Sequence, residues 1–299
     1  MKIIITGLPY FGKKVLANLL EADKKNKYIF LNTYYSNADR LRFLWHIWSS
    51  DCVYSINGTT NNSFVISMAI YLNKRVVFHW VGSDVILAKE AAEKKTINER
   101  FLKYPVHLTD SPWFVEDLKK IGIESRYFPL LTVENIPEKP VIPDEFSILT
   151  YIPQNDQEFY GLPAIIEVAK QFPEIKFKIA GSKETSLPIT PNIQLLDWVN
   201  YMKPLFESST ICIRFLKHDG LSFFVLESLL YGKHVIYNRT FNHCNFASNV
   251  SEMASVISEL FTKFRIGELA PNESGREFVI REFSKENVLT LSKILAIKT

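Results

Sequence analysis

The stretch from Thr210 to Tyr237 gathers polar groups between two apolar runs. The runs 210–215 and 234–237 are each typical of a buried parallel strand. Ser222 is a favoured N-cap residue for a helix that would end near Gly232. The free backbone N–H groups at the start of such a helix, over residues 220–222, attract phosphate. The stretch therefore predicts a strand, a loop, an anion-binding helix and a second strand.

Glu227 lies within this predicted helix, whose other residues are nearly all apolar. A helix that is apolar all round is typical of a buried position, so we expect Glu227 to be buried. A buried carboxylate is costly unless donors satisfy it, and the two hydroxyls of a ribose are suitable donors. The helix is thus predicted to hold a diphosphate at its tip and a ribose further along.

This layout resembles the donor site of GT-B glycosyltransferases, especially glycosyltransferase family 4. Asp219 stands for the first acidic residue of the family pattern, 220–226 for the seven-residue gap, and Glu227 for the second acid. The resemblance implies that Asp219 and Glu227 are catalytic. It also implies that the donor is bound by Arg214, His218, Gly220, Leu221, Ser222, Glu227 and, through backbone, Val199.

A second resemblance lies where the predicted strand 75–78 ends in His79, followed by Gly82-Ser83-Asp84. Ligands of open α/β sheets bind outside the carboxyl ends of strands, so this loop is expected at the active site. The family resemblance implies catalytic roles for His79, near the donor sugar or the acceptor, and for Asp84. A structural histidine and an Asp84 that caps the next helix remain the alternative.

The chain departs from the family pattern after the strand predicted at 146–150. Family members carry an Arg and then a Lys-Gly there, and both clamp the diphosphate. Here residues 151–159 contain no basic residue, and Tyr160-Gly161 occupies the Lys-Gly position. Arg214 is the candidate replacement because a guanidinium can grip a phosphate through two bonds.

The elements that would position these residues alternate between strand and helix along all 299 residues. The resemblance predicts the GT-B architecture, two Rossmann-like α/β domains with parallel sheets that face each other across a cleft. We expect a first domain over 1–135, a Pro-containing linker near 133–144 and a nucleotide-sugar-binding domain over 145–275. Residues 276–299 are expected to form helical segments that cross back to the first domain.

Charge is distributed unevenly over the chain. Residues 1–139 hold 19 Lys and Arg against 14 Asp and Glu, a net charge of +5, whereas the remainder carries −2. A basic first half favours an anionic partner or membrane surface, although ordinary solvated lysines explain it nearly as well. The stretch 40–48, with two Arg and two Trp, fits an amphipathic membrane helix or a helix packed on the sheet.

The sequence has three cysteines without metal-ligand spacing, and no apolar window of about 20 residues. Both features favour a cytoplasmic protein, either associated with the cytoplasmic face of a membrane or not bound to a membrane. We expect no metal and no cofactor, since the nucleotide sugar is a substrate. The family resemblance implies a retaining glycosyltransferase that acts on a glycan or lipid-linked acceptor. Two alternatives remain: a catalytically inert sugar or nucleotide binder, and a P-loop phosphotransferase suggested by residues 7–14.

Overall fold

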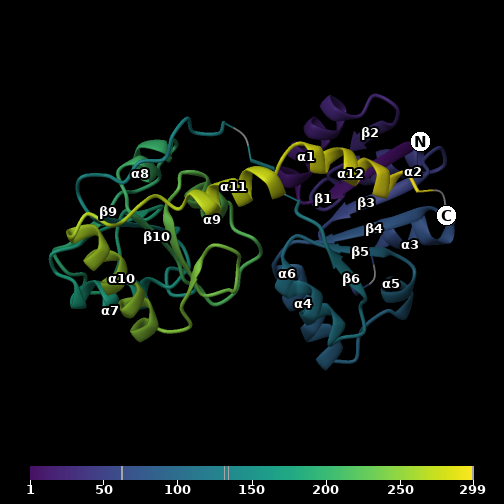
Figure 1. Cartoon of the computed structure of the whole chain (residues 1–299). Helices are drawn as coiled ribbons and strands as arrows, with labels where there is room; N and C mark the ends of the chain where they lie inside the picture. Colours follow the sequence, from purple (N-terminus) through teal and green to yellow (C-terminus); the bar gives the residue numbers. More distant parts are fainter. Residues whose placement is uncertain (62, 131, 134, 298–299) are drawn as a thin grey trace. The chain divides into compact units, whose positions relative to one another are not determined.

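The structure, a computed structural model, describes residues 1–61, 63–130, 132–133 and 135–297. The chain divides into two compact units. Unit 1 comprises Met1–Thr132 and Phe283–Thr299, and unit 2 comprises Val133–Glu282. Each unit is built on its own parallel sheet covered by helices, so the predicted α/β class is confirmed (Figure 1).

The sheet of unit 1 has six parallel strands in the order β2-β1-β3-β4-β5-β6. The strands are β1 (Lys2–Gly7), β2 (Lys27–Phe30), β3 (Cys52–Ile56), β4 (Arg75–Trp80), β5 (Val106–Thr109) and β6 (Ser125–Tyr127). The order reverses between β1 and β3, because successive strands are added first on one side of β1 and then on the other. Such a switch point leaves a crevice at the carboxyl ends of the two strands.

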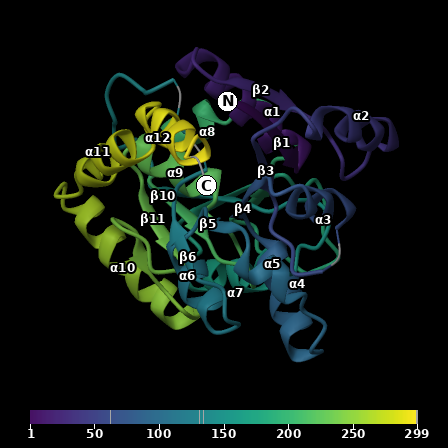
Figure 2. The same cartoon turned by 90° about the vertical axis from the view of Figure 1, so that its right-hand side faces the viewer.

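Helices cover both faces of this sheet, and the alternation of side chains along β1 separates two cores. Ile3 and Ile5 pack with α1 and α12, which lie side by side, whereas Ile4 packs on the opposite face with the other helices. Within that second group α4 and α6 are neighbours (Figure 1, Figure 2). The helices of unit 1 are α1 (Pro9–Ala22), α2 (Asn37–Ile47), α3 (Phe64–Tyr71), α4 (Ser83–Glu93), α5 (Glu99–Lys103), α6 (Pro112–Lys119) and α12 (Glu286–Leu295).

The sheet of unit 2 also has six parallel strands, in the order β12-β11-β10-β7-β8-β9. The strands are β7 (Ser147–Tyr151), β8 (Lys176–Ala180), β9 (Ile193–Leu195), β10 (Ile211–Arg214), β11 (His234–Tyr237) and β12 (Asn245–Phe246). Counted within the unit, this is the 3-2-1-4-5-6 order of dinucleotide-binding folds, whose switch point lies between β7 and β10.

Two pairs of helices cover the sheet of unit 2. α7 (Leu162–Gln171) and α10 (Val250–Arg265) pack together over one apolar core, and α9 (Phe223–Leu230) contacts α11 (Glu273–Glu282). The short α8 (Lys203–Glu207) precedes β10. The strand–loop–helix–strand order predicted for 210–237 is confirmed by β10, α9 and β11.

Residues 7–14 do not form a phosphate loop. β1 ends at Gly7 and α1 begins at Pro9, so Gly12 and Lys13 lie inside the helix rather than in a loop before it. The P-loop alternative is therefore wrong for this fold, because its phosphate cradle is made by loop backbone. Cys52 and Cys212 are buried core residues, as predicted.

Helix α2 combines the two environments expected for the stretch 40–48. Phe43 and Ile47 are buried against the sheet, whereas Leu41, Trp45 and Trp48 are exposed. The core interpretation is thus confirmed for one face of the helix only. Among the described residues, no helix is both long and apolar enough to cross a membrane.

Candidate functional site

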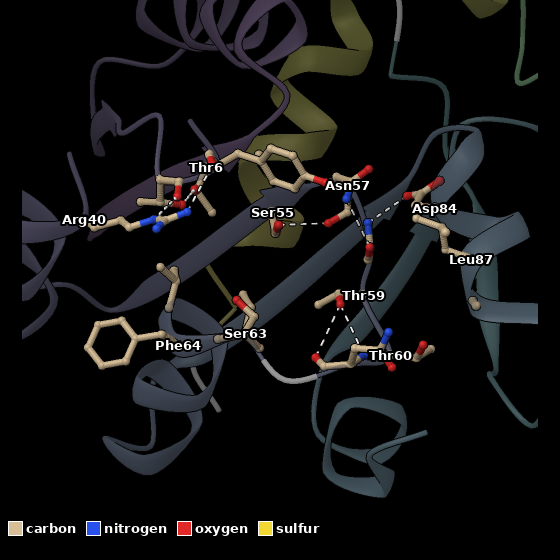
Figure 3. Close-up of a pocket in the computed structure, with 18 residues that line it drawn as sticks. Thr6, Arg40, Ser55, Asn57, Thr59, Thr60, Ser63, Phe64, Asp84 and Leu87 are labelled. Carbon is tan, nitrogen blue, oxygen red and sulfur yellow. Dashed lines mark hydrogen bonds between the residues drawn. The ribbon is translucent and has the colours of Figure 1, made fainter. Parts of the chain in front are cut away.

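A polar pocket of about 640 Å³ lies at the switch point of unit 1 (Figure 3). Its floor comes from the carboxyl ends of β1 and β3, and its walls come from the first turns of α2, α3 and α4 and from the segments that precede α2 and α3. The lining residues are Thr6, Gly7, Thr33, Tyr34, Arg40, Ser55, Asn57, Gly58, Thr59, Thr60, Asn61, Ser63, Phe64, Val65, Ile66, Asp84, Leu87 and Ala88. Its volume falls within the roughly 300–1,000 Å³ of small-ligand sites.

Asn57 follows β3 in a conformation that few residues other than glycine adopt, with φ of 126°. The hydroxyl of Ser55 donates to the Asn57 carbonyl, and the Asn57 N–H donates to the carbonyl of His79. The next residue, Gly58, lies against the Trp80 ring, where a Cβ would approach ring atoms to 2.2 Å. Backbone held in this way costs free energy, and such strain clusters at ligand sites.

Asp84 joins two loops at the edge of the pocket. Its carboxylate accepts from the backbone N–H groups of Gly58, Val81, Gly82 and Val85, and its side chain is almost fully enclosed. Burial raises the pKa of Asp84 to about 6, although the four hydrogen bonds oppose the rise. The alternative that Asp84 is the N-cap of the next helix is wrong in detail: Gly82 is the N-cap of α4, and Asp84 satisfies backbone groups from inside its first turn.

His79 is fully buried, and both of its ring nitrogens have partners within unit 1. Nε2 lies 2.9 Å from the Phe128 carbonyl oxygen, which can only accept, so Nε2 carries the proton. Nδ1 accepts from the Tyr54 hydroxyl at 2.7 Å. Burial lowers the pKa of His79 to about 3, so the ring is neutral. Contact with a ligand would require His79 to exchange one of these bonds.

Arg214 lies at the switch point of unit 2, at the carboxyl end of β10. Its Nη1 is 3.3 Å from the carbonyl oxygen of Tyr151, the last residue of β7, so the side chain bridges the two strands where the order reverses. Its Nε donates to the Asp219 carboxylate at 2.8 Å. The guanidinium carbon also lies 5.5 Å from the centre of the Tyr160 ring, within range of a cation–π contact.

The loop after β10 lies directly against the start of α7. The Lys217 N–H donates to the Phe159 carbonyl at 3.0 Å, and the Lys217 ammonium pairs with Glu158. Gly161, the N-cap of α7, has a φ of 84°, and a Cβ there would lie 1.8 Å from the Phe215 carbonyl oxygen. Only glycine fits this close approach, which brings the amino-terminal ends of α7 and α9 to one edge of the sheet.

Glu227 does not occupy the buried position expected from the sequence. It is exposed, whereas its neighbours on α9 from Phe224 to Leu230 are buried. The expectation of a buried carboxylate is wrong because α9 has one face open to solvent, and Glu227 is the residue on that face. Ser222 is the N-cap of α9 and the chain turns away at Gly232, both as predicted.

The remaining predicted donor residues fall into two places. His218 and Gly220 are half-buried in the loop between β10 and α9, and Leu221 is buried beside them. The Gly220 carbonyl oxygen accepts from the Tyr237 hydroxyl at 3.3 Å. Val199 lies in a separate loop, between β9 and α8. The structure therefore brings Arg214 and Asp219 into contact, while His79 and Asp84 belong to the other unit.

Of the residues that line the pocket of unit 1, the sequence analysis predicted Asp84 as a site residue but missed the others, including Arg40, Asn57 and Thr60. The signal was present in Asn57-Gly58-Thr59-Thr60, a polar run directly after a buried strand and therefore at the carboxyl edge of the sheet. Tyr151 was also missed, because its carbonyl rather than its side chain makes the contact. Within the described residues, no group of three or more His, Cys, Asp and Glu side chains is placed to hold a metal ion.

Comparison with solved structures identifies the architecture. Sucrose-phosphate synthase from Thermosynechococcus elongatus superposes with a TM-score of 0.73 over 98% of both chains, at 10% sequence identity. The Anabaena protein HepE, solved with UDP and glucose, gives 0.67 over 99% of both chains at 10% identity. WaaG, a glycosyltransferase of lipopolysaccharide biosynthesis, gives 0.62 over 99% of this chain and 100% of WaaG at 12% identity.

No protein-family model and no curated protein matches the sequence. The structural similarity extends over both units, with a six-stranded parallel sheet in each. At these identities it establishes the fold. The chain has the GT-B fold.

Proposed function

We propose that this protein transfers a sugar from a nucleotide-diphosphate sugar to an acceptor hydroxyl. The observation that carries the proposal is the position of Arg214 at the β7–β10 switch point, where folds of this strand order bind nucleotides. The amino-terminal ends of α7 and α9 meet at the same edge, and backbone N–H groups there favour negative charge.

Arg214 supplies the cation that the family pattern would place elsewhere. Its guanidinium lies over Tyr160, which occupies the position of the family lysine, so the charge is restored at the same place from a different strand. Asp219 holds one edge of the guanidinium through Nε. An orientated guanidinium can donate from its outer nitrogens to a diphosphate, and Asp219 acts by fixing that orientation.

Glu227 is the proposed ligand of the donor ribose. Its exposure supports this role, because a carboxylate open to solvent can accept from two hydroxyls without moving the helix. His218, Gly220, Leu221 and Ser222 would form the loop around the diphosphate, and backbone at Val199 would meet the base. No cofactor enters this scheme, since the nucleotide sugar is consumed as a substrate.

UDP is the first nucleotide to test, because HepE was solved with UDP and glucose, and the pneumococcal O-GlcNAc transferase GtfA was solved with UDP and GlcNAc.

We further propose retention of anomeric configuration and a role in glycan or glycolipid synthesis on the cytoplasmic face of a membrane. The acceptor would bind to unit 1, where His79 and Asp84 support the pocket walls. Proton NMR of the first-formed product reports retention or inversion directly.

An exposed apolar stripe supports contact with a membrane. Leu41 and Trp45 of α2 and its C-cap residue Trp48 are spaced at helical intervals and are 70, 82 and 68% exposed. Tryptophan is enriched at membrane interfaces, and the basic first half adds attraction to anionic lipid. Sedimentation with vesicles tests this contact: Trp45→Ser with Trp48→Ser should reduce binding to anionic vesicles, and salt should weaken it. Equal binding by the double variant would contradict it.

A catalytically inert binding protein on the same fold is the second candidate. It is favoured by one observation: the loop 151–159 carries no basic residue, so the family's clamp is incomplete. Incubation with a bound donor separates the two candidates. An enzyme of this class releases nucleoside diphosphate slowly even without acceptor, whereas an inert binder leaves the donor intact.

A further inference from the structure

We propose that the pocket of unit 1 binds a sugar that carries an anionic group, with Arg40 as the residue that selects the charge. The inference rests on the proposed function in one respect, since it treats this sugar as the acceptor. Its evidence comes from the lining of the pocket alone.

The lining points to a ligand rich in hydroxyl groups. Most small-molecule pockets are predominantly apolar with a few polar groups. Here eight of the 18 lining residues are Ser, Thr or Asn, and they come from three separate segments of unit 1. Hydroxyl and amide side chains both donate and accept, which matches the alternating demands of a polyol. The exposed ring of Phe64 at the rim offers an apolar surface for one face of a sugar.

Two described lining residues carry charge, and their environments differ. The Asp84 carboxylate is 2% exposed and is surrounded by backbone N–H groups that use both oxygens. Arg40 is exposed on the opposite side of the pocket (Figure 3). A ligand in the pocket can therefore contact the guanidinium directly, whereas both oxygens of the Asp84 carboxylate already accept from backbone N–H groups.

Arg40 is held in place and keeps donors to spare. Its Nε donates to the Thr33 carbonyl at 2.8 Å, one Nη donates to the Tyr34 carbonyl at 3.1 Å, and the other donates to the Asn37 side chain at 3.1 Å. A guanidinium has five N–H groups, and these contacts within the described residues use three. Because the side chain is already ordered, it loses little conformational entropy when the two remaining donors bind a carboxylate or phosphate.

The test compares a neutral sugar with matched anionic ones by saturation-transfer NMR at constant ionic strength. The probes are glucose, glucuronate and glucose 6-phosphate. We expect the wild-type chain to bind both anionic sugars about tenfold more tightly than glucose, as a charge-assisted hydrogen bond would give. Comparison of glucuronate with glucose 6-phosphate shows whether the pocket prefers a carboxylate or a phosphate as the anionic group. Equal binding of all three, or no binding of any, would overturn the proposal.

Arg40→Gln removes the charge while retaining a donor for the Thr33 and Tyr34 carbonyls. It should reduce binding of both anionic sugars to the level of glucose, whereas Arg40→Lys should retain a reduced preference. Arg42→Gln is the matched control, because Arg42 lies on the same helix and pairs with Asp39 outside the pocket. Persistence of the preference in Arg40→Gln, with an unchanged melting temperature, would refute the role of Arg40.

UDP binding, measured on the same samples, keeps the two proposals separate. If the anionic preference is present and no nucleotide diphosphate binds, the pocket inference stands and the proposed transferase function fails. If UDP binds and the sugars do not discriminate by charge, the transferase proposal stands and the pocket inference fails.

Discussion

Arg214 and Asp219 form an ion pair at 2.8 Å that connects the end of β10 with the loop before α9. Both side chains are mostly enclosed, and Arg214 also reaches the Tyr151 carbonyl of β7. Removing one partner of an enclosed pair leaves the other charge unsatisfied. The pair therefore fixes both the position of the guanidinium and the path of the loop at the proposed diphosphate site.

Replacement of Arg214 should weaken the binding of nucleoside diphosphates more than the binding of nucleosides. We expect Arg214→Ala to weaken binding of a nucleoside diphosphate by about 1.5–3 kcal/mol, the range for a hydrogen bond to a charged group, and to affect the bare nucleoside little. Arg214→Lys should rescue only part of the loss, because the planar fork is absent. Calorimetric titration with UDP and with uridine measures both. An equal loss for the two ligands would make Arg214 structural.

Glu227→Gln should weaken nucleotide binding by about 1–3 kcal/mol and leave the melting temperature almost unchanged, since the side chain is exposed. Glu259→Gln on α10 is the control, because Glu259 is an exposed carboxylate of the same unit that pairs only with Lys263 among the contacts described. The same titration applied to both variants checks the prediction. Indistinguishable affinities for the two variants would remove Glu227 from the site.

Replacement of Gly161 tests whether the close approach of α7 to the loop after β10 is required for stability and nucleotide binding. Gly161→Ala should destabilise unit 2 by about 2–4 kcal/mol, because the new methyl group would collide with the Phe215 carbonyl. It should also reduce nucleotide binding by shifting the loop that carries Asp219. Denaturant unfolding of the variant and the wild-type chain measures the loss of stability.

Gly267→Ala is the matched control for Gly161→Ala. Gly267 also has a positive φ, of 74°, but in the described part of the chain no atom beyond its two sequence neighbours lies within 4 Å of the place that its new methyl group would take. Only the cost of the left-handed backbone remains, about 1 kcal/mol. Equal losses of stability in the two variants would exclude the steric effect at Gly161.

Buried His79 should make the chain less stable in acid. Its pKa is about 3 in the folded state against an ordinary 6.5, so the unfolded chain binds more protons between these values. The contribution of His79 is present above pH 6.5 and is lost as the pH falls toward 3. From pH 7 to 4.5 the loss should be about 2–3 kcal/mol. His79→Gln should show a smaller loss in denaturant titrations at the two pH values, and an identical loss would indicate that His79 is protonated in the folded state.

The strands of both units were predictable because parallel strands are buried on both faces and read as continuous apolar runs, as in Ile3–Ile5 and Ile211–Ile213. The same criterion, a continuous apolar run, led to the wrong prediction that Glu227 on α9 is buried. The apolar residues of α9 occupy most of its circumference, and the sequence does not specify that α11 and the sheet leave a strip open at Glu227. Local periodicity reports which residues are apolar, whereas the exposed strip depends on tertiary packing.

The pocket of unit 1 was harder to predict because its residues come from segments distant in sequence. Thr6, Thr33 and Asp84 meet only because the strand order reverses at β1 and β3. Arg214, in contrast, was identified from its position at the end of a strand before a helix. The sequence can thus predict which residue lies at the end of one strand. Which residues of other strands it meets at the switch point depends on the order of strands in the sheet.

We infer that the switch-point edge of unit 2 binds a nucleotide-diphosphate sugar. Thermal unfolding with UDP, GDP, ADP and CMP and their sugars tests it most directly, because a ligand that binds the folded state raises the melting temperature. We predict that at least one diphosphate sugar raises the melting temperature of the wild-type chain, and that the rise is much smaller in Arg214→Ala and Glu227→Gln. A melting temperature unchanged by every ligand at millimolar concentration, or an undiminished rise in both variants, would exclude donor binding at this edge.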